Sequence, residues 1–221
     1  MTKRALFLGA TGLVGGHCLS LLTFHYDHII VLTRRPLDVN HPKCEVHIVS
    51  FDNMEAFLPL FHVDDVYCCL GTTIKKAGSQ AAFRKVDYEY PLTAARLAKR
   101  AGASRFLVIT AMGSDQKSPF FYSRVKGELE ADLESLNLHE LHILQPSLIL
   151  GDRSEFRFGE KFAAWLSPLF AWLLIGSLKR YRPIQARRIA MAMIEAATFS
   201  QPGIHRYRSD KLEEMAARYP S

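Results

Sequence analysis

Short runs of apolar residues alternate, along the first 150 residues, with longer segments that carry apolar residues at helical spacing. The short runs are continuously apolar, which is typical of strands buried on both faces of a parallel sheet. We predict strands at Arg4–Leu8, His28–Leu32, Glu45–Val49, Asp65–Leu70, Arg105–Thr110 and Leu141–Gln145. We predict helices at Gly12–Thr23, Asn53–Leu58, Gln80–Ala101 and Phe120–Leu136.

This alternation predicts a doubly wound α/β fold, because right-handed crossovers place helices on both faces of one mostly parallel sheet. We expect a single domain over residues 1–221. Ligands bind such folds at the carboxyl ends of the strands. The residues that follow each predicted strand are therefore the first candidates for a site.

The alternation of short apolar runs with helical segments stops after residue 150. We expect residues 151–221 to form a small C-terminal, substrate-side portion of the same domain. In its second half the pattern predicts a helix at Gln185–Phe199 and a late strand at Gly203–Tyr207. A last helix is predicted at Ser209–Arg218, where Ser209 or Asp210 can cap the N-terminus.

Aromatic rings gather in the first half of this portion, at Phe156, Phe158, Phe162, Trp165, Phe170 and Trp172. Two interpretations stay open: the rings close the end of the sheet, or they form an apolar pocket or partner surface. The apolar stretch Phe162–Ile175 is interrupted by Ser167 and Pro168 and is too short to span a bilayer. We predict two packed helical pieces there and no membrane span.

The first predicted strand runs directly into a glycine-rich turn, and the first predicted helix follows. Glycine allows a tight turn and lets the backbone approach a pyrophosphate, while the helix N-terminus offers free N–H groups to the anion. A merely structural turn is the alternative. We predict a dinucleotide cradle made of Gly9, Thr11, Gly12, Leu13, Val14 and Gly15.

The residues after the second predicted strand favour NADP(H) over NAD(H). An acidic residue there would bind the ribose 2′-hydroxyl, whereas a basic one accommodates a 2′-phosphate. The chain has Thr33, Arg34 and Arg35 at this point, and no carboxylate before Asp38. Arginine can bind a phosphate through two hydrogen bonds. Ordinary surface charge is the alternative interpretation of both arginines.

Two further strand ends fit a nucleotide groove. Asp52 follows the third predicted strand, where its carboxylate either meets the adenine amino group or caps a helix. Leu70, Gly71 and Thr72 follow the fourth, where glycine lets the backbone pass close to the adenosine ribose. We expect these residues to bind the cofactor.

Tyr122 and Lys126 are four residues apart in a predicted helix and so share one face of it. An ammonium group near a phenol favours the phenolate and lowers a pKa that is otherwise about 10. Such a phenol can exchange a proton with a substrate near neutral pH. Tyr-x-x-x-Lys also arises by chance as a surface pair, so its context decides.

That context is specific. Thr110-Ala111-Met112-Gly113-Ser114 precedes Tyr122-Ser123-Arg124-Val125-Lys126-Gly127-Glu128, and Gln145-Pro146-Ser147-Leu148-Ile149-Leu150-Gly151-Asp152-Arg153 follows. With the G-x-x-G-x-x-G spacing of the first turn, these motifs resemble the atypical short-chain dehydrogenases/reductases of the NAD(P)-binding Rossmann superfamily, in their Tat-interacting-protein-like branch. The resemblance covers nearly the whole chain.

The resemblance implies an oxidoreductase that transfers hydride to or from a carbonyl or alcohol compound. The basic residues after the second strand add NADP(H) as the cofactor, and the aromatic rings after residue 150 add a small, hydrophobic substrate. The resemblance also implies that Tyr122 is the general acid/base and that Lys126 lowers its pKa and holds the nicotinamide ribose. Thr110 matches the hydroxyl that orients the carbonyl, with Ser114 as the alternative, and Pro146 matches the segment beside the nicotinamide. The asparagine that relays protons in other members has no match here. A cofactor-binding regulator, redox sensor or assembly protein is the second interpretation.

Charge and composition narrow the remaining classes. The formal net charge is +6 but no long basic run occurs, so we expect no nucleic acid partner. The four cysteines and nine histidines show no metal-ligand spacing, so we expect no metal site. Residues 1–4 lead straight into the first strand and leave no room for a secretory signal, so we expect a cytoplasmic protein. A homodimer is left open.

Overall fold

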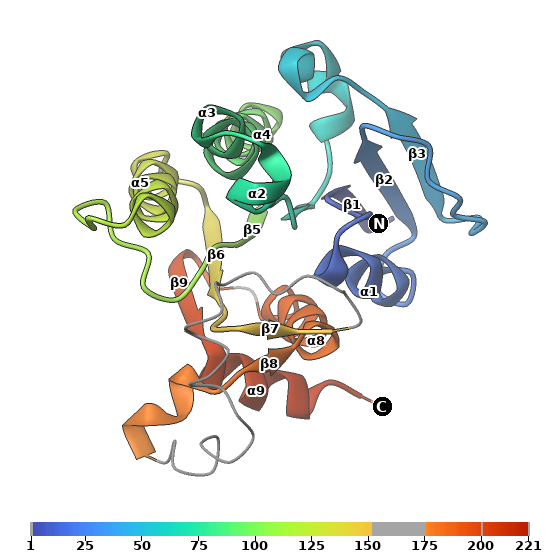
Figure 1. The fold of residues 1–221 in the computed structure, drawn as a ribbon. Coiled ribbons are helices and arrows are strands. Elements are labelled where there is room, and N and C mark those ends of the chain that lie inside the picture. The colour runs from blue at the N-terminus through green and yellow to red at the C-terminus, as the bar shows by residue number, and fades with distance from the viewer. Residues whose placement is uncertain (1, 152–175, 200, 221) are drawn as a thin grey trace.

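The computed structural model describes residues 2–151, 176–199 and 201–220 (Figure 1). The two helical pieces predicted over Phe162–Ile175 and the six aromatic rings named above lie outside these described residues.

Seven parallel strands form the main sheet, in the order β3-β2-β1-β4-β5-β6-β9. Each of the six strands predicted before residue 150 is present, with ends that shift by at most two residues. The strands are β1 Arg4–Leu8, β2 His28–Thr33, β3 Cys44–Ile48, β4 Asp65–Cys68, β5 Arg105–Ile109, β6 Glu140–Gln145 and β9 Gly203–Arg208. The predicted doubly wound α/β fold is confirmed, with the strand order of a dinucleotide-binding sheet extended by one strand.

Helices cover both faces of this sheet, and each face has its own apolar core. On one face lie α1 Leu13–Leu22, α8 Ala186–Ala196 and α9 Ser209–Arg218 (Figure 1). On the other lie the 3₁₀ segment Phe51–Phe61, α4 Tyr90–Ala101 and α5 Phe121–Ser135. In the described part of the chain, no helix is long and apolar enough to cross a membrane.

The C-terminal elements complete the main sheet and its core. β9 pairs with β6, and α8 packs against α1 and α9. Ile189 and Met193 of α8 and Leu212 of α9 are fully buried in the same core as Leu19 of α1. The predicted helix, strand and helix of this region are confirmed, although α8 ends at Ala196, before the predicted end at residue 199.

The long helix predicted at Gln80–Ala101 is divided in the structure. It consists of α3 Gln80–Arg84, a π-helical segment Lys85–Glu89 and α4. The N–H of Tyr90 donates to the carbonyl of Lys85, the five-residue step of a π-helix. Pro91 follows, and because proline has no N–H to donate, regular α-helical bonding is interrupted at this point. Such π segments often mark functional sites.

Other local differences have similar causes. The short helix predicted at Asn53–Leu58 is a longer 3₁₀ segment with non-helical backbone at Asn53 and Phe57 and with Pro59 inside it. Several elements of two to six residues were not predicted because they are too short to show periodicity. They are helix α2 at Ile74–Ala77, the 3₁₀ segment Gly176–Tyr181, and a two-stranded parallel sheet of β7 Ile149–Leu150 and β8 Ile184–Gln185.

The glycine-rich turn brings β1, α1 and the end of β4 into contact that no side chain would allow. A Cβ atom on Gly15 would lie 2.0 Å from the carbonyl oxygen of Gly9, and one on Gly9 would lie 2.5 Å from the backbone of Cys69. Gly9 also has a φ of +93°, which disfavours any residue with a side chain. The glycine spacing therefore serves backbone packing as well as the predicted phosphate approach.

We predict that Gly15→Ala destabilises the protein by about 1–3 kcal/mol, the usual cost of overpacking. The added methyl group must displace the Gly9 carbonyl, which itself accepts a hydrogen bond from the N–H of Gly12. The free energy of unfolding from urea titration measures this effect.

Gly16→Ala is the matched control on the same helix. Its Cβ would meet only the carbonyl oxygen of Ala10, at 3.8 Å. We expect this variant to gain roughly 0.5–1 kcal/mol, because alanine is the better helix former. Equal losses in both variants would contradict the close-packing argument.

Candidate functional site

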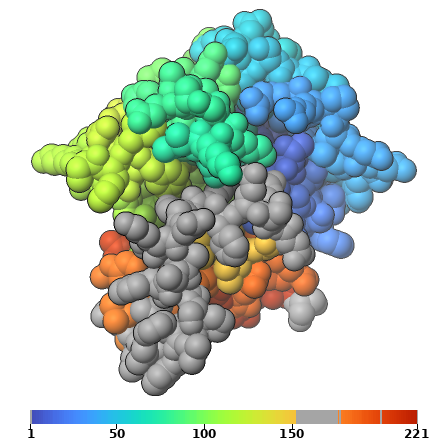
Figure 2. Space-filling view, in the orientation of Figure 1, coloured from blue at the N-terminus to red at the C-terminus, as the bar shows by residue number. Residues whose placement is uncertain are grey.

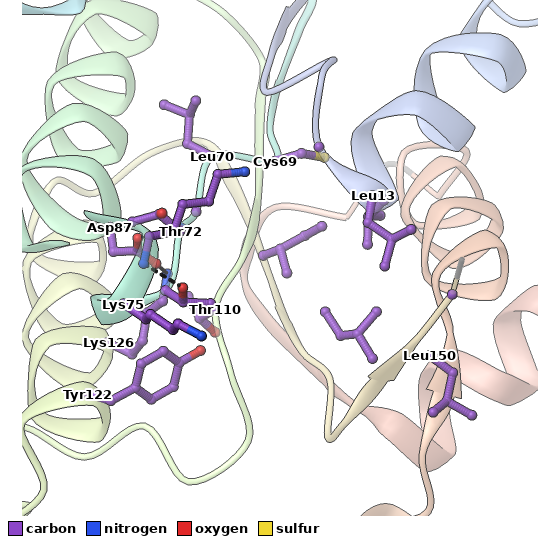
Figure 3. Close-up of a pocket in the computed structure, with 18 of the residues that line it drawn as sticks. Leu13, Cys69, Leu70, Thr72, Lys75, Asp87, Thr110, Tyr122, Lys126 and Leu150 are labelled. Atoms are coloured by element: carbon purple, nitrogen blue, oxygen red, sulfur yellow. Dashed lines mark hydrogen bonds and ion pairs between the residues drawn. The ribbon is translucent and has the colours of Figure 1, made fainter. Parts of the chain in front are cut away.

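A cavity of about 840 Å³ lies where β1, β4 and β5 end (Figure 3). This is the edge at which α/β sheets bind ligands. The described residues that line it are Gly12, Leu13, Val14, Cys69, Leu70, Gly71, Thr72, Thr73, Lys75, Lys76, Asp87, Ile109, Thr110, Tyr122, Lys126, Ile149, Leu150, Gly151 and Gln185. Residues from widely separated parts of the sequence thus meet around one space.

The three residues predicted as catalytic all line this cavity. Thr110 comes directly after β5 and is 3% exposed, while Tyr122 and Lys126 come from successive turns of α5. The ring of Phe83 packs against the Tyr122 ring with centroids 5.6 Å apart. In Figure 3 the Tyr122 hydroxyl is directed toward the part of the cavity where Thr110 lies.

The structure distinguishes the two hydroxyl candidates by position. Thr110 lines the cavity, and its hydroxyl donates to the carbonyl of Leu144 over a rather long 3.3 Å. Ser114 is not part of the cavity wall, and its hydroxyl donates to the carbonyl of Ala111 at 2.7 Å.

Lys126 has a partner that the sequence analysis did not identify. Its ammonium nitrogen lies 2.7 Å from Oδ1 of Asp87, and the two side chains are 3% and 2% exposed. The other carboxylate oxygen of Asp87 accepts a hydrogen bond from the backbone N–H of Thr72, also at 2.7 Å. Asp87 thereby connects the π segment, the loop after β4 and α5. No sequence pattern relates Asp87 to Lys126, because 39 positions separate them and neither belongs to a shared motif.

Two cationic residues of the cavity wall were also missed. Lys75 and Lys76 belong to the single-turn helix α2, which no periodicity reveals. The Thr73 side chain caps this helix by accepting from the N–H of Lys76 at 3.0 Å, and Gly78 ends it in a left-handed conformation. Short polar caps of this kind were the available signal.

The residues around the first turn fit a dinucleotide phosphate. Gly12 is the N-cap of α1 and provides no side-chain hydrogen bond, and no acidic residue occupies the first turn. The first N–H groups of the helix therefore have no capping side chain, as an anion site requires. Gly12, Leu13 and Val14 line the cavity, whereas Gly9 and Gly15 form the turn outside its wall and Thr11 is exposed.

From the loop after β4, the predicted cofactor residues Leu70, Gly71 and Thr72 all line the cavity. Pro146, at the end of β6, is buried outside the wall and its carbonyl accepts from the N–H of Met112 at 2.9 Å. Cys69 also faces the cavity. A hydrogen bond with Cys18, together with desolvation, holds the pKa of its thiol well above the ordinary value, so the thiol is neutral.

The residues predicted to select the cofactor lie beyond this cavity. Arg34 and Arg35 are exposed after β2. Thr33 is buried, and its hydroxyl donates to the carbonyl of Arg35 at 2.9 Å, which ties down the start of the loop.

Asp52 is held by two neighbours. Its carboxylate lies 2.7 Å from the Lys85 ammonium and accepts from the Tyr90 hydroxyl at 2.6 Å. These hydrogen bonds, from Lys85 first and Tyr90 second, hold the pKa of Asp52 below its usual value. Asp52 is not the N-cap of the 3₁₀ segment, because Ser50 takes that position. No group of three or more potential metal ligands occurs among the described residues.

Curated proteins similar to this chain include Protein HTATIP2 from Rattus norvegicus, which is 35% identical over 174 residues, 76% of this chain and 70% of that protein. They also include Protein FMP52, mitochondrial, from Candida albicans, 31% identical over 217 residues, 93% of this chain and 91% of that protein. These relatives confirm the Tat-interacting-protein-like resemblance.

The fungal relatives correct one expectation. FMP52 proteins from Candida albicans, Meyerozyma guilliermondii and Lodderomyces elongisporus are all named as mitochondrial. The prediction of a cytoplasmic protein is therefore contradicted. Its basis was the short lead of residues 1–4 before the first strand, which bears only on secretory signals.

Solved structures of similar fold include the Bordetella bronchiseptica enzyme WbmH in complex with NAD+, with a TM-score of 0.68 and 15% identity over 98% of this chain and 79% of that one. UDP-glucose 4-epimerase from Thermotoga maritima has a TM-score of 0.68 and 13% identity over 99% and 84%. At such identities the likeness shows the fold alone. The model of the NAD dependent epimerase/dehydratase family matches residues 5–130, more than half of the chain. The chain belongs to the NAD dependent epimerase/dehydratase family.

Proposed function

We propose that this protein is an NADP(H)-dependent oxidoreductase that transfers hydride to or from a small carbonyl or alcohol compound. One observation carries the proposal: Thr110, Tyr122 and Lys126 line the same cavity at the strand ends, beside the glycine-rich turn. A structural pair on the surface would not place a phenol, an ammonium and a hydroxyl around one space.

The cofactor is held by two backbone segments in this proposal. Gly12, Leu13 and Val14 bind the diphosphate through the N-terminus of α1, and Leu70 to Thr72 pass beneath the adjoining ribose. Arg34 and Arg35 bind the 2′-phosphate, with Thr33 fixing the start of their loop. When bound, the nicotinamide supplies the hydride chemistry, and the protein supplies orientation and proton transfer.

Tyr122 is the proton donor in reduction and the acceptor in oxidation. Its ring is fixed by Phe83, so its hydroxyl is presented to the cavity in one orientation. Thr110 donates a hydrogen bond to the same substrate oxygen. Its contact with the Leu144 carbonyl is long, so rotation of the hydroxyl toward a substrate costs little. Stabilising a developing oxyanion is normally the largest contribution to such catalysis.

Asp87 is a positioning residue for Lys126. Separating a buried ion pair leaves an uncompensated charge, which is costly. The Lys126 ammonium group is therefore held next to the Asp87 carboxylate. An ammonium has three donors, and the bond to Asp87 uses one of them in the direction of the π segment. In this proposal the Lys126 ammonium group also contacts the nicotinamide ribose and the Tyr122 side.

The same ion pair favours a second candidate function, a cofactor-binding regulatory or assembly protein with little turnover. The Asp87 carboxylate offsets the Lys126 charge at 2.7 Å, which weakens its electrostatic effect on a neighbouring phenol. Turnover measurements separate the two candidates.

We place one domain over residues 1–221, with the substrate-side portion in residues 151–221. Substrate selection by the aromatic rings of that portion belongs to the same proposal. Measuring the mass of the protein in solution tests whether it forms a homodimer.

We predict that Tyr122→Phe abolishes NADPH oxidation in a screen of aldehydes and ketones and leaves NADPH affinity within about twofold. Removal of a general acid typically costs on the order of 10²–10⁴-fold. Stopped assays and calorimetry measure the two quantities. Tyr219→Phe is the matched control, because the Tyr219 hydroxyl is hydrogen-bonded to His25 and Tyr219 does not line the cavity. Wild-type rates in Tyr122→Phe would reject the assigned role.

We predict that calorimetry shows tighter binding of NADPH than of NADH. Replacing Arg34 and Arg35 together by alanine should weaken NADPH by about tenfold or more, as loss of charge-assisted phosphate bonds implies, and change NADH little. A clear preference of the wild type for NADH would overturn the NADP(H) proposal.

We predict that Asp87→Asn lowers the free energy of unfolding by about 3–5 kcal/mol, because Lys126 keeps a buried charge without its partner. Glu55→Gln is the control, since its ion pair with Arg100 is more than half exposed and contributes about 0–1 kcal/mol. Urea titration at pH 7 compares them. Equal losses of unfolding free energy in the two variants would show that the buried ion pair stabilises the protein no more than an exposed one.

A further inference from the structure

Two lysines of α2 give the cavity wall a positive charge that the described lining residues do not balance. Of the described residues that line it, Asp87 alone carries a carboxylate, and that carboxylate already pairs with Lys126 and accepts from Thr72. Lys75 and Lys76 are exposed and make no ion pair with any described residue. In the described part of the wall, two cations therefore have no carboxylate partner.

The position of Lys75 separates it from the predicted phosphate cradle. Lys75 and Tyr122 both line the cavity, and Figure 3 draws them on the side of it away from Leu13 and Leu150. Leu13 marks the first turn of α1, where the diphosphate is proposed to bind. An anion held by Lys75 would thus share the cavity with the Tyr122 hydroxyl.

The segment that carries Lys75 is held in place. Thr73 caps α2, the N–H of Gly78 donates to the carbonyl of Ile74 at 3.0 Å, and the N–H of Thr72 is bound by Asp87. Figure 2 shows the green segment that contains α2 at the surface of the face drawn. The helix that carries Lys75 is thus held in place, while its ammonium group is accessible.

We propose that Lys75, assisted by Lys76, recognises a carboxylate or phosphate group on the substrate, so that the substrate class is an anionic carbonyl compound. The inference rests on the proposed function and names its substrate class. A charge-assisted contact beside Tyr122 orients the carbonyl, and it disfavours neutral analogues, which leave the ammonium without a partner.

The test uses two matched probes, 4-formylbenzoate and its methyl ester, which differ in one negative charge. Their dissociation constants are measured by calorimetry on the full chain saturated with NADP+, and kcat/KM is measured with NADPH. The variants are Lys75→Gln, Lys75→Arg and Lys211→Gln. Lys211 is an exposed residue of α9 that pairs with Glu214.

We expect the wild type to prefer the carboxylate probe in both measurements. Lys75→Gln should reduce the ratio of the two dissociation constants by about tenfold or more, the loss of one charge-assisted contact. Lys75→Arg should keep most of the preference, and Lys211→Gln all of it. NADPH affinity in Lys75→Gln should stay within about twofold.

Three results would overturn the inference. They are no preference for the carboxylate probe in the wild type, an unchanged preference in Lys75→Gln, or a loss of NADPH affinity in Lys75→Gln as large as its loss of preference. The last would assign the lysine to a phosphate of the cofactor. The binding ratio also distinguishes the two proposals. A preference that depends on Lys75 without any turnover would reject the oxidoreductase and keep the anion site.

Discussion

The buried contact between Lys126 and Asp87 is the interaction on which the candidate site depends. It joins α5 to the π segment, and through the N–H of Thr72 it also fixes the loop after β4. Helix α5 supplies the phenol, and the loop after β4 supplies the backbone that faces the predicted ribose and leads into the cationic helix α2. A site assembled from separate parts of the sequence needs such a common point, because each loop alone would be free to adopt other positions.

The first turn imposes the second constraint. Gly9, Gly15 and the backbone of Cys69 approach each other within distances that exclude a Cβ atom. This close packing sets α1 directly over the end of β4, so the N-terminus of the helix faces the cavity. The glycine motif therefore has a structural role whether or not a phosphate is bound, and the phosphate role adds to it.

Most of the fold could be predicted from the sequence because its strands are continuous apolar runs. β1, β2 and β5 are almost fully buried, so their composition leaves little ambiguity. Thr110, Tyr122 and Lys126 could be grouped because they lie in short motifs around one strand and one helix. Elements of two to four residues, such as α2 and β7, carry no period and were missed.

Asp87 was missed for a different physical reason. Its partner is distant in the sequence, and its environment depends on packing that no local pattern encodes. The NADP(H) preference and the roles of individual side chains stay predictions, because they concern contacts with molecules rather than with the chain itself. Localisation was predicted wrongly, since an argument about secretory signals does not choose among the other compartments.

The π segment has a consequence for how the family can vary. Each residue advances an α-helix by about 100°, so the extra residue between α3 and α4 turns everything before it by that angle. A homologue that lost one residue there would keep its strand order. The residue that corresponds to Asp87 would nevertheless point to another side of the helix. The lysine on α5 would then need a different counter-ion or would be neutral.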